Sequence, residues 1–246
     1  MDYNVEHCKP FESKNNIWMK LEHVGRYLFA FDFLKDKKVK FVADIACGDG
    51  YGSDILSQGA KKVISVDRNF AYFNKQYLLN KKISFLNLDL NKDEDYKKLP
   101  KLDAVVSFET LEHLKYPEQF ISNVYNLLNT NGWFILSFPN KLFERFDENG
   151  ENKDKYHLHI FDKENVENFL TSVGFKIYDI LGQGQCNELC SLNSMLIKKK
   201  ILKQKNIDCC FNYDKTSIKT LSQLLSYPNN INIDKSYSYI YILKKQ

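Results

Sequence analysis

Apolar side chains near the start of the chain recur at the spacing of a helix. In residues 17–34, Leu21, Val24, Leu28 and Phe31 lie three or four positions apart. Because a helical turn takes about 3.6 residues, these side chains share one face. The pattern predicts an amphipathic helix that packs this face against the rest of the molecule.

Further along, short runs rich in Val, Ile and Phe lie between segments with turn residues. The runs lack polar alternation, which is typical of strands buried on both faces of a parallel sheet. Six such strands are predicted, at residues 39–47, 62–67, 82–90, 102–109, 133–140 and 175–181. Helical patterns separate several of them, at residues 53–60, 69–80, 117–132 and 162–175. The order predicts an α/β fold with a doubly wound, mostly parallel sheet between helices.

Two of these helices carry signals at both ends. Pro117 begins the helix at 117–132, and an Asn-Gly pair ends it. Asp162 is a suitable N-cap for the helix at 162–175, and Gly174 a suitable C-cap.

The last part of the chain is less regular. Residues 236–245 alternate and predict a seventh strand, which we place at an edge of the sheet. Residues 185–235 hold a lysine-rich helix candidate, SMLIKKKILKQK, within an otherwise indistinct polar segment, and we interpret them as an insertion. One domain is therefore expected, with lead-in helices at 1–36, a core at 37–182, the insertion and the last strand at 236–246.

Composition narrows the classes of function. Of the 246 residues, 43% are hydrophobic and 27% charged, with a net charge of +4, which is ordinary for a soluble globular protein. Charges of both signs are scattered, which argues against nucleic acid as a partner. No apolar run approaches the length of a membrane span, and the first residues lack a signal core. A cytoplasmic protein without membrane insertion is expected.

The six cysteines are expected to be reduced thiols in such a protein. Cys186, Cys190, Cys209 and Cys210 do not show the two-residue separation of paired zinc ligands. Only three residues are arginine. Because arginine differs from lysine in offering a planar, two-pronged hydrogen-bond donor, these positions are candidates for sites that need such a donor. Of these, Arg145 is interpreted as a surface residue.

The stretch VADIACGDGYGS at 42–53 places an acid, Asp44, inside an apolar run and then alternates glycine with other residues. Ligands of open α/β sheets bind beyond the carboxyl ends of the strands. The glycine spacing does not fit the Gly-x-Gly-x-x-Gly of a dinucleotide site, and Asp44 would repel a pyrophosphate. A ligand with an ammonium group suits this carboxylate, with the glycines making room for a nucleoside.

The pattern D-x-x-C-G-x-G-x-G resembles the first motif of class I S-adenosylmethionine-dependent methyltransferases. Further pieces follow in the order of that family: VISVD, LNLDL, FETLEHL, the Pro-Asn pair of SFPN and YHLHIF. The resemblance covers about residues 20–182. The segment EHVGRYLFA also resembles the lead-in helix of a subgroup that tailors sugars and surface polysaccharides. The resemblance implies a Rossmann-like methyltransferase fold and S-adenosyl-L-methionine as cofactor, with S-adenosyl-L-homocysteine as product.

The resemblance also implies roles for single residues. Asp44 would take the ammonium of the cofactor, Asp67 both ribose hydroxyls and Asp89 the adenine amino group, while Arg26, with Tyr27 nearby, would clamp the carboxylate. The full set expected to contact the cofactor is Arg26, Tyr27, Asp44, Ala46, Gly48, Gly50, Asp67, Arg68, Asp89, Leu90 and Phe108.

Catalytic candidates lie in FETLEHL, after the fourth strand. His113 is the best candidate for a general base, because its ordinary pKa is near neutral, and Glu109 and Glu112 accompany it. The alternative is that Glu112 and His113 only hold the loop together.

Tyr156, His157 and His159 fall in the segment that lines the acceptor pocket in relatives, and we assign them to substrate binding. The two histidines are two residues apart on an extended segment and should point the same way. A third metal ligand is not evident, so no metal is predicted.

The expected reaction is O-methylation of a small polar or anionic metabolite, such as a sugar or a phosphoramidate precursor of a capsule or surface polysaccharide. A quinone or lipid methyltransferase and a cofactor-binding protein without catalysis remain open, and so does a homodimer. A methyltransferase acting on nucleic acid would carry an Asn/Asp-Pro-Pro-aromatic motif where this chain has FETLEHL.

Overall fold

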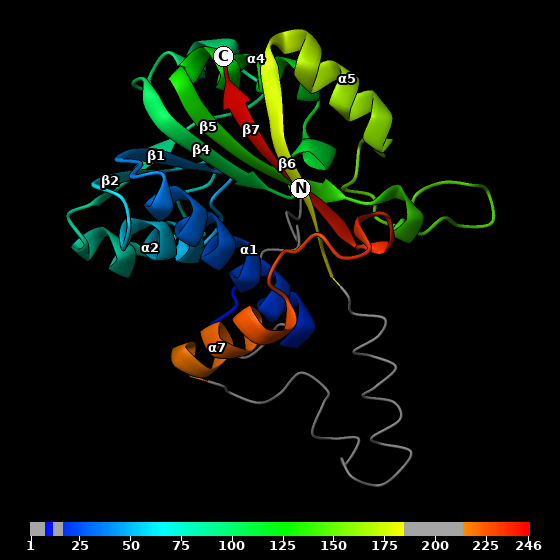
Figure 1. The fold of residues 1–246 in the computed structure, drawn as a ribbon, viewed down its shortest axis with the longest axis horizontal. Helices are drawn as coiled ribbons and strands as arrows, with labels where there is room; N and C mark the ends of the chain where they lie inside the picture. The colour runs from blue at the N-terminus through cyan, green and yellow to red at the C-terminus, as the bar shows by residue number, and fades with distance from the viewer. Residues whose placement is uncertain (1–7, 12–16, 185–213) are drawn as a thin grey trace, which may run out of the picture.

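The computed structural model describes residues 8–11, 17–184 and 214–246. Its strands form one seven-stranded sheet in the order β3-β2-β1-β4-β5-β7-β6 (Figure 1). The strands are β1 Phe41–Ile45, β2 Lys62–Asp67, β3 Ile83–Asn87, β4 Leu102–Phe108, β5 Leu128–Pro139, β6 Phe175–Gln183 and β7 Ser238–Lys245. The pairs β1–β2, β2–β3, β1–β4 and β4–β5 are parallel, and β7 is antiparallel to both of its neighbours. The predicted doubly wound, mostly parallel sheet is confirmed.

Helices cover both faces of this sheet (Figure 1). One face carries α1 Ile17–Asp36, α2 Tyr51–Ser57 and α7 Lys215–Leu225. The other carries α3 Asp93–Tyr96, α4 Pro117–Leu127 and α5 Lys163–Val173. Short 3₁₀ turns are η1 Lys75–Leu79, η2 Leu111–His113, η3 Lys141–Phe143 and η5 Ile233–Lys235. In the described ranges, the helices are too short or too polar to cross a bilayer.

The side-chain alternation of the central strands divides the core into two layers. In β1, Val42 packs into the apolar cluster beneath α1 and α2, whereas Ala43 and Ile45 pack into the cluster beneath α4 and α5. Both layers are apolar because the strand is buried on both faces, as its continuous apolar run predicts. Asp44 follows the same alternation, so its side chain points toward α1 and α2.

Residues 69–80 do not form the predicted helix. They make a turn followed by the 3₁₀ turn η1. The side chains of Asn69 and Asn74 accept hydrogen bonds from the backbone N–H groups of Ala71 and Gln76, at 3.0 and 3.1 Å. Such local hydrogen bonds to asparagine side chains compete with the hydrogen-bond pattern of an α-helix. They account for the turns found here in place of the predicted helix.

The last strand is not at an edge, as the sequence suggested, but lies between β5 and β6. Its alternation is not polar against apolar. Tyr239 and Tyr241 pack into one core layer and Ile240 and Ile242 into the other. The Tyr241 hydroxyl lies 2.9 Å from Glu167 Oε1, so the ring is buried while its polar tip is satisfied.

Other boundaries hold or shift by a few residues. Asp162 caps α5 by accepting from the Glu164 N–H, and Gly174 ends it with a φ of +108°, as predicted. By contrast, α4 ends at Leu127, because Leu128 is already paired with Leu102 of β4. Within the predicted insertion, the structure describes α7 and η5; the lysine-rich helix candidate and the four cysteines considered as zinc ligands lie outside the described residues.

A chain of buried polar groups joins β1 to the helices above it. Asp44 is completely buried. Its Oδ1 accepts from the Tyr27 hydroxyl of α1 at 2.8 Å, and its Oδ2 accepts from the Ser53 hydroxyl of α2 at 2.6 Å. Ser65, paired with Asp44 in the sheet, hydrogen-bonds to Ser53 at 2.7 Å. This Tyr27–Asp44–Ser53–Ser65 network holds α1 and α2 in position against β1 and β2.

Burial raises the pKa of Asp44 from 3.8 to about 6. The hydrogen bonds from Ser53 and Tyr27 act in the opposite direction, and the charges of Asp67 and Asp49 add to the rise. A carboxyl whose pKa is raised by folding stabilises the fold while it is protonated. That contribution is complete below about pH 4 and is lost as the pH rises through about 6.

Asp44→Asn should therefore remove a pH-dependent part of the stability. Between about pH 4 and pH 7 the unfolding free energy of the wild-type protein should fall by about 2 kcal/mol relative to the variant. Carboxyls remote from Asp44 titrate equally in both proteins and cancel in the difference. Urea denaturation across this pH range measures it, and a difference that stays constant with pH would show that Asp44 is not the group that titrates.

Candidate functional site

A cavity of about 640 Å³ lies at the carboxyl ends of the parallel strands. Its walls come from α1, the turns after β1, β2, β3 and β4, and the segment between η3 and α5. A volume of this size suits a ligand the size of a nucleoside amino acid. Most residues singled out in the sequence line it: Arg26, Tyr27, Ala46, Gly48, Asp67, Arg68, Asp89, Leu90, Phe108, Glu109, Glu112, His113, Tyr156 and His157. The cavity lining does not include Asp44, Gly50 or His159.

Only the first glycine of the turn leaves space toward the cavity. A Cβ on Gly48, whose φ is +56°, would meet nothing within 4 Å. A Cβ on Gly50 would lie 2.4 Å from the ring of Phe73, and one on Gly52 would lie 2.2 Å from the ring of Tyr27. Gly50 and Gly52 are thus required by packing within the protein, and the prediction that all the glycines make room for a ligand applies to Gly48.

Two non-glycine residues at the cavity adopt left-handed backbone conformations. Ala46 directly follows β1 with a φ of +61°, and Glu109 directly follows β4 with a φ of +46°. Such conformations cost about 1 kcal/mol or more each and are concentrated at functional sites. Because β1 and β4 are neighbours, the two turns bend the chain away from the sheet side by side and open the space above its edge.

Two carboxylates stand where the next strands end. Asp67, the last residue of β2, accepts from the backbone N–H groups of Gly48 and Asn69, both at 3.0 Å. The bond to Gly48 ties the tip of β2 to the glycine turn. Asp89 follows β3 and is about 40% exposed, and it accepts from the Asn91 N–H at 3.1 Å. Carboxylates such as these can accept further hydrogen bonds from hydroxyl or amino groups.

Arg26 is almost fully buried, with 2% exposure, and two elements hold it. Its Nε donates to Gln183 Oε1 of β6 at 2.8 Å, and its Nη1 lies 2.9 Å from Glu109 Oε1. Gln183 also donates to the backbone carbonyls of Glu22 and Ser226, which joins β6 to α1 and to the end of α7.

Glu109 is engaged on both carboxylate oxygens. Besides Arg26, its Oε1 accepts from the Ser137 hydroxyl at 2.7 Å, and its Oε2 accepts from the Ser238 hydroxyl at 3.2 Å. These partners lie on β5 and β7, so Glu109 fastens the turn after β4 to its neighbours in the sheet. The structure favours a positioning role for Glu109 over the catalytic one that the sequence suggested.

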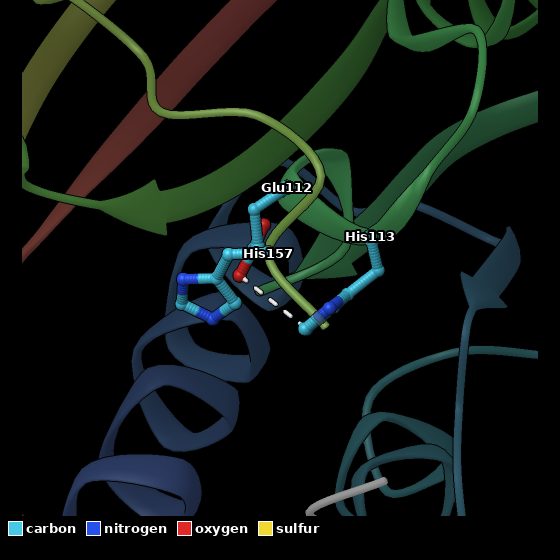
Figure 2. A group of neighbouring side chains, drawn as sticks. All are labelled: Glu112, His113 and His157. Atoms are coloured by element: carbon cyan, nitrogen blue, oxygen red, sulfur yellow. Dashed lines mark ion pairs between the residues drawn. The ribbon is translucent and has the colours of Figure 1, made fainter. Parts of the chain in front are cut away.

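His113 and His157 lie together although 43 residues separate them in the chain (Figure 2). Their ring centroids are 5.1 Å apart. Nδ1 of His113 lies 2.9 Å from the carbonyl oxygen of Tyr156, and Nδ1 of His157 lies 2.8 Å from Glu144 Oε1. Carbonyl and carboxylate oxygens only accept, so Nδ1 carries the hydrogen in both rings. In the neutral rings, Nε2 therefore holds a lone pair.

Glu112 stands beside these rings and is 1% exposed (Figure 2). Neither of its carboxylate oxygens has a hydrogen-bond partner within the described part of the chain, and Oε1 is 3.8 Å from Nε2 of His113. Burial raises the pKa of Glu112 well above its usual value, and nearby Glu109 adds to the rise. Burial also lowers the pKa of His113, which is thus neutral near pH 7.

The backbone carbonyl of Glu112 receives hydrogen bonds from the N–H groups of Leu158 and His159, at 2.7 and 3.3 Å. These bonds bring the segment around residue 157 against η2. His159 itself does not share the environment of His157, because its ring stacks on Phe161 with centroids 5.8 Å apart. The two histidines thus lie in different surroundings, and of the two only His157 lines the cavity.

The sequence missed several residues of the cavity. Arg145, interpreted as a surface residue, lines it, and so do Asp154, Tyr237 and Cys8. Asp154 and Arg145 lie in an irregular loop, where no periodic pattern shows which side chains face the cavity. Arg145 is exposed, as expected, and lines the cavity as well. Tyr237 is brought in because β7 is central in the sheet.

A family model described as a methyltransferase domain matches residues 20–180 of the chain. A probable S-adenosylmethionine-dependent methyltransferase of Mycolicibacterium smegmatis is 26% identical over 146 residues, or 57% of this chain and 54% of that protein. The mitochondrial ubiquinone biosynthesis O-methyltransferase of Dictyostelium discoideum is 29% identical over 115 residues, or 42% of this chain and 36% of that protein. The match thus spans only about a third to a half of the length of these curated relatives.

Solved structures share the fold. An S-adenosylmethionine-dependent methyltransferase from Clostridium acetobutylicum has a TM-score of 0.58 at 12% identity, covering 91% of this chain and 92% of that one. Magnesium protoporphyrin IX methyltransferase from Synechocystis, solved with S-adenosylhomocysteine, has a TM-score of 0.57 at 16% identity, covering 93% and 86%. The family match shows that the chain belongs to the family of methyltransferase domains, and the solved structures show that it shares the fold of S-adenosylmethionine-dependent methyltransferases.

Proposed function

We propose that the chain transfers a methyl group to an oxygen atom of a small polar or anionic acceptor. The observation that carries the proposal is that one cavity holds two different sets of groups. The carboxylates of Asp67 and Asp89 stand near the open space at Gly48, and the Glu112–His113–His157 cluster lies in the wall formed by η2 and the segment before α5. The first set suits a nucleoside, and the second suits an acceptor.

The lining after β1, β2 and β3 fits S-adenosylmethionine. Asp67 would accept hydrogen bonds from the ribose hydroxyls, and Asp89 would accept one from the adenine amino group. The same cavity is also lined by Ala46, Arg68, Leu90 and Phe108. Bound there, the cofactor supplies a methyl group activated by a positively charged sulfur. Asp44 lies beneath this floor and acts through Tyr27, whose ring packs against Phe108 with centroids 4.9 Å apart.

The residues of the acceptor side are charged or hydrogen-bonding: Glu112, His113, Arg145, Asp154, Tyr156 and His157. Burying such groups against an apolar molecule would cost free energy, because their hydrogen bonds to water would be lost. A sugar hydroxyl or a phosphoramidate oxygen satisfies them instead. These groups support a precursor of a capsule or surface polysaccharide over a quinone as the acceptor.

The chemical task of the protein is to align the acceptor oxygen with the methyl group and to remove the hydroxyl proton. The Nε2 lone pair of His113 is available for this proton, since Nδ1 is held by the Tyr156 carbonyl. Arg26 and Glu109 hold the turn after β4 in place, which fixes η2 and His113.

The acceptor class is tested by release of S-adenosylhomocysteine from S-adenosylmethionine with candidate acceptors. Nucleotide sugars and phosphoramidates should be methylated at oxygen, and a catechol bearing an isoprenoid tail should not. Methylation of the isoprenoid catechol alone would assign the chain to the quinone class. Absence of turnover with every acceptor, together with binding of the cofactor, would favour a binding protein without catalysis.

Asp67→Asn should weaken binding of S-adenosylmethionine about 10- to 100-fold, because a hydrogen bond to a charged acceptor contributes about 1.5–3 kcal/mol. Asp179→Asn is a matched control, since Asp179 is an exposed residue of β6 that the cavity lining does not include. Isothermal titration calorimetry gives both dissociation constants. Equal affinities in the two variants would remove Asp67 from the cofactor site.

His113→Ala should lower kcat about 10²- to 10⁴-fold, the range expected when a positioned proton acceptor is lost. Binding of S-adenosylmethionine should stay within about threefold of wild type, because His113 belongs to the acceptor side. Steady-state kinetics and calorimetry on the same preparation separate the two effects. A variant that keeps kcat, or loses cofactor binding in parallel, contradicts this assignment.

A further inference from the structure

We propose that Glu112, His113 and His157 bind a divalent transition-metal cation at the acceptor end of the cavity. The inference deepens the proposed function and rests on it for the identity of the acceptor, although the site itself stands on the geometry. Each residue offers one ligand atom, and these atoms all lie within 4.8 Å of one another (Figure 2). The sequence predicted no metal because it showed no third ligand near His157; the fold supplies two.

The hydrogen bonds of the two histidines prepare them as ligands. A metal-binding imidazole usually donates its other N–H to a carboxylate or a backbone carbonyl, which fixes its tautomer and orientation. His113 donates to the Tyr156 carbonyl and His157 to Glu144. Glu144 is held in turn by the side-chain amide of Asn152, at 2.8 Å from Oε2. Both Nε2 lone pairs are left for a cation.

The carboxylate of Glu112 supplies the second, independent observation. It is 99% buried, and neither oxygen has a hydrogen-bond partner in the described residues. A buried carboxylate without a partner costs several kcal/mol when charged, which native proteins normally avoid. It also lines the cavity, so an ion entering from the cavity can reach it. A bound cation would compensate the negative charge of this carboxylate.

The three ligand atoms lie slightly farther apart than the ligands of a bound metal. Ligand atoms about 2.0–2.2 Å from a metal are about 3–3.5 Å apart. Glu112 Oε1 and His113 Nε2 are 3.8 Å apart, and the widest ligand separation in the group is below 4.8 Å. Small changes in the side-chain torsions that move each ligand atom by about 1 Å or less would bring the three atoms to ligating distances.

The ligand types select the cation. Imidazole nitrogens suit Fe²⁺, Ni²⁺, Cu²⁺ and Zn²⁺, with Co²⁺ between Fe²⁺ and Ni²⁺ in affinity, whereas Mg²⁺, Ca²⁺ and Mn²⁺ prefer oxygen ligands. Three protein ligands leave coordination positions open for water or a substrate oxygen. Asp154 Oδ2, 3.6 Å from Nε2 of His157, adds negative charge beside the site. Glu109 is engaged by Arg26 and two serines and is not counted as a ligand.

Such an ion would activate an acceptor hydroxyl directly. When the hydroxyl oxygen binds the cation, its O–H bond breaks, the electron pair stays on oxygen and the proton passes to water. Binding to a divalent ion lowers the pKa of a ligated hydroxyl or water by several units. With the cation bound, the lone pair of His113 is a ligand and cannot also take the proton, so the metal replaces the general-base role proposed for His113 above. Loss of activity in His113→Ala is expected under either role, and Co²⁺ binding tells the two roles apart.

The test measures Co²⁺ binding to chelator-treated full-length protein, by calorimetry and by the visible absorption of the bound ion, without cofactor or acceptor. One Co²⁺ per chain is expected, bound at least tenfold more tightly than Mg²⁺. Glu112→Gln and His113→Ala should each weaken Co²⁺ at least 100-fold, since even loss of a residue that orients a ligand costs about 10- to 100-fold. Glu144→Gln should fall in that smaller range.

His159→Ala is the matched control, because His159 is two residues from His157 but stacks on Phe161 away from the cavity. It should bind Co²⁺ like wild type. No binding by the wild-type protein, or equal binding by wild type, Glu112→Gln and His113→Ala, overturns the metal site. Circular dichroism of each variant verifies that it is folded. Failure of the methyl-transfer assay leaves the Co²⁺ result intact, so the two proposals fail separately.

Discussion

The arrangement of the whole cofactor end depends on one buried carboxylate. Asp44 stands in the central strand of a sheet covered on both faces, where a charge is costly unless hydrogen bonds satisfy it. Tyr27 from α1 and Ser53 from α2 supply those bonds. The position of α1 relative to the sheet follows, and with it Arg26, one residue before Tyr27, which reaches Glu109 and Gln183. Two adjacent residues of α1, Arg26 and Tyr27, thereby connect the turn after β4 to the tip of β1.

The same contacts bear on the two residues with a left-handed backbone conformation, which directly follow β1 and β4. Ala46 and Glu109 end neighbouring strands, and each redirects the chain above the edge of the sheet. The strain at Glu109 is opposed by bonds to Arg26, Ser137 and Ser238, which come from three different elements. The packed sheet and α1 therefore hold Glu109 in its left-handed conformation.

Features that depend on local chemistry were accessible from the sequence. The strand ends, the glycine turn and Asp67 follow from apolar runs and turn residues, and their place at one edge follows from a parallel sheet. The direction of the Asp44 side chain follows from alternation along β1, but its partners do not, because Tyr27 and Ser53 reach it through tertiary packing. For the same reason Gly50 and Gly52 could not be told apart from Gly48: the rings of Phe73 and Tyr27 decide their role.

The acceptor side was the least predictable part, and the reason is physical. His113 comes from a turn fixed by the sheet, whereas His157 comes from an irregular segment that the Glu112 carbonyl pulls into place. No period in the sequence encodes a contact between two loops. In the proposed function, the two parts of the cavity have different tasks. Groups at the ends of regular strands would hold the cofactor, and loop residues after β4 and before α5 would contact the acceptor. Changes in the segment around residues 144–157 can therefore alter the acceptor while the Asp44 network and the cofactor floor stay the same.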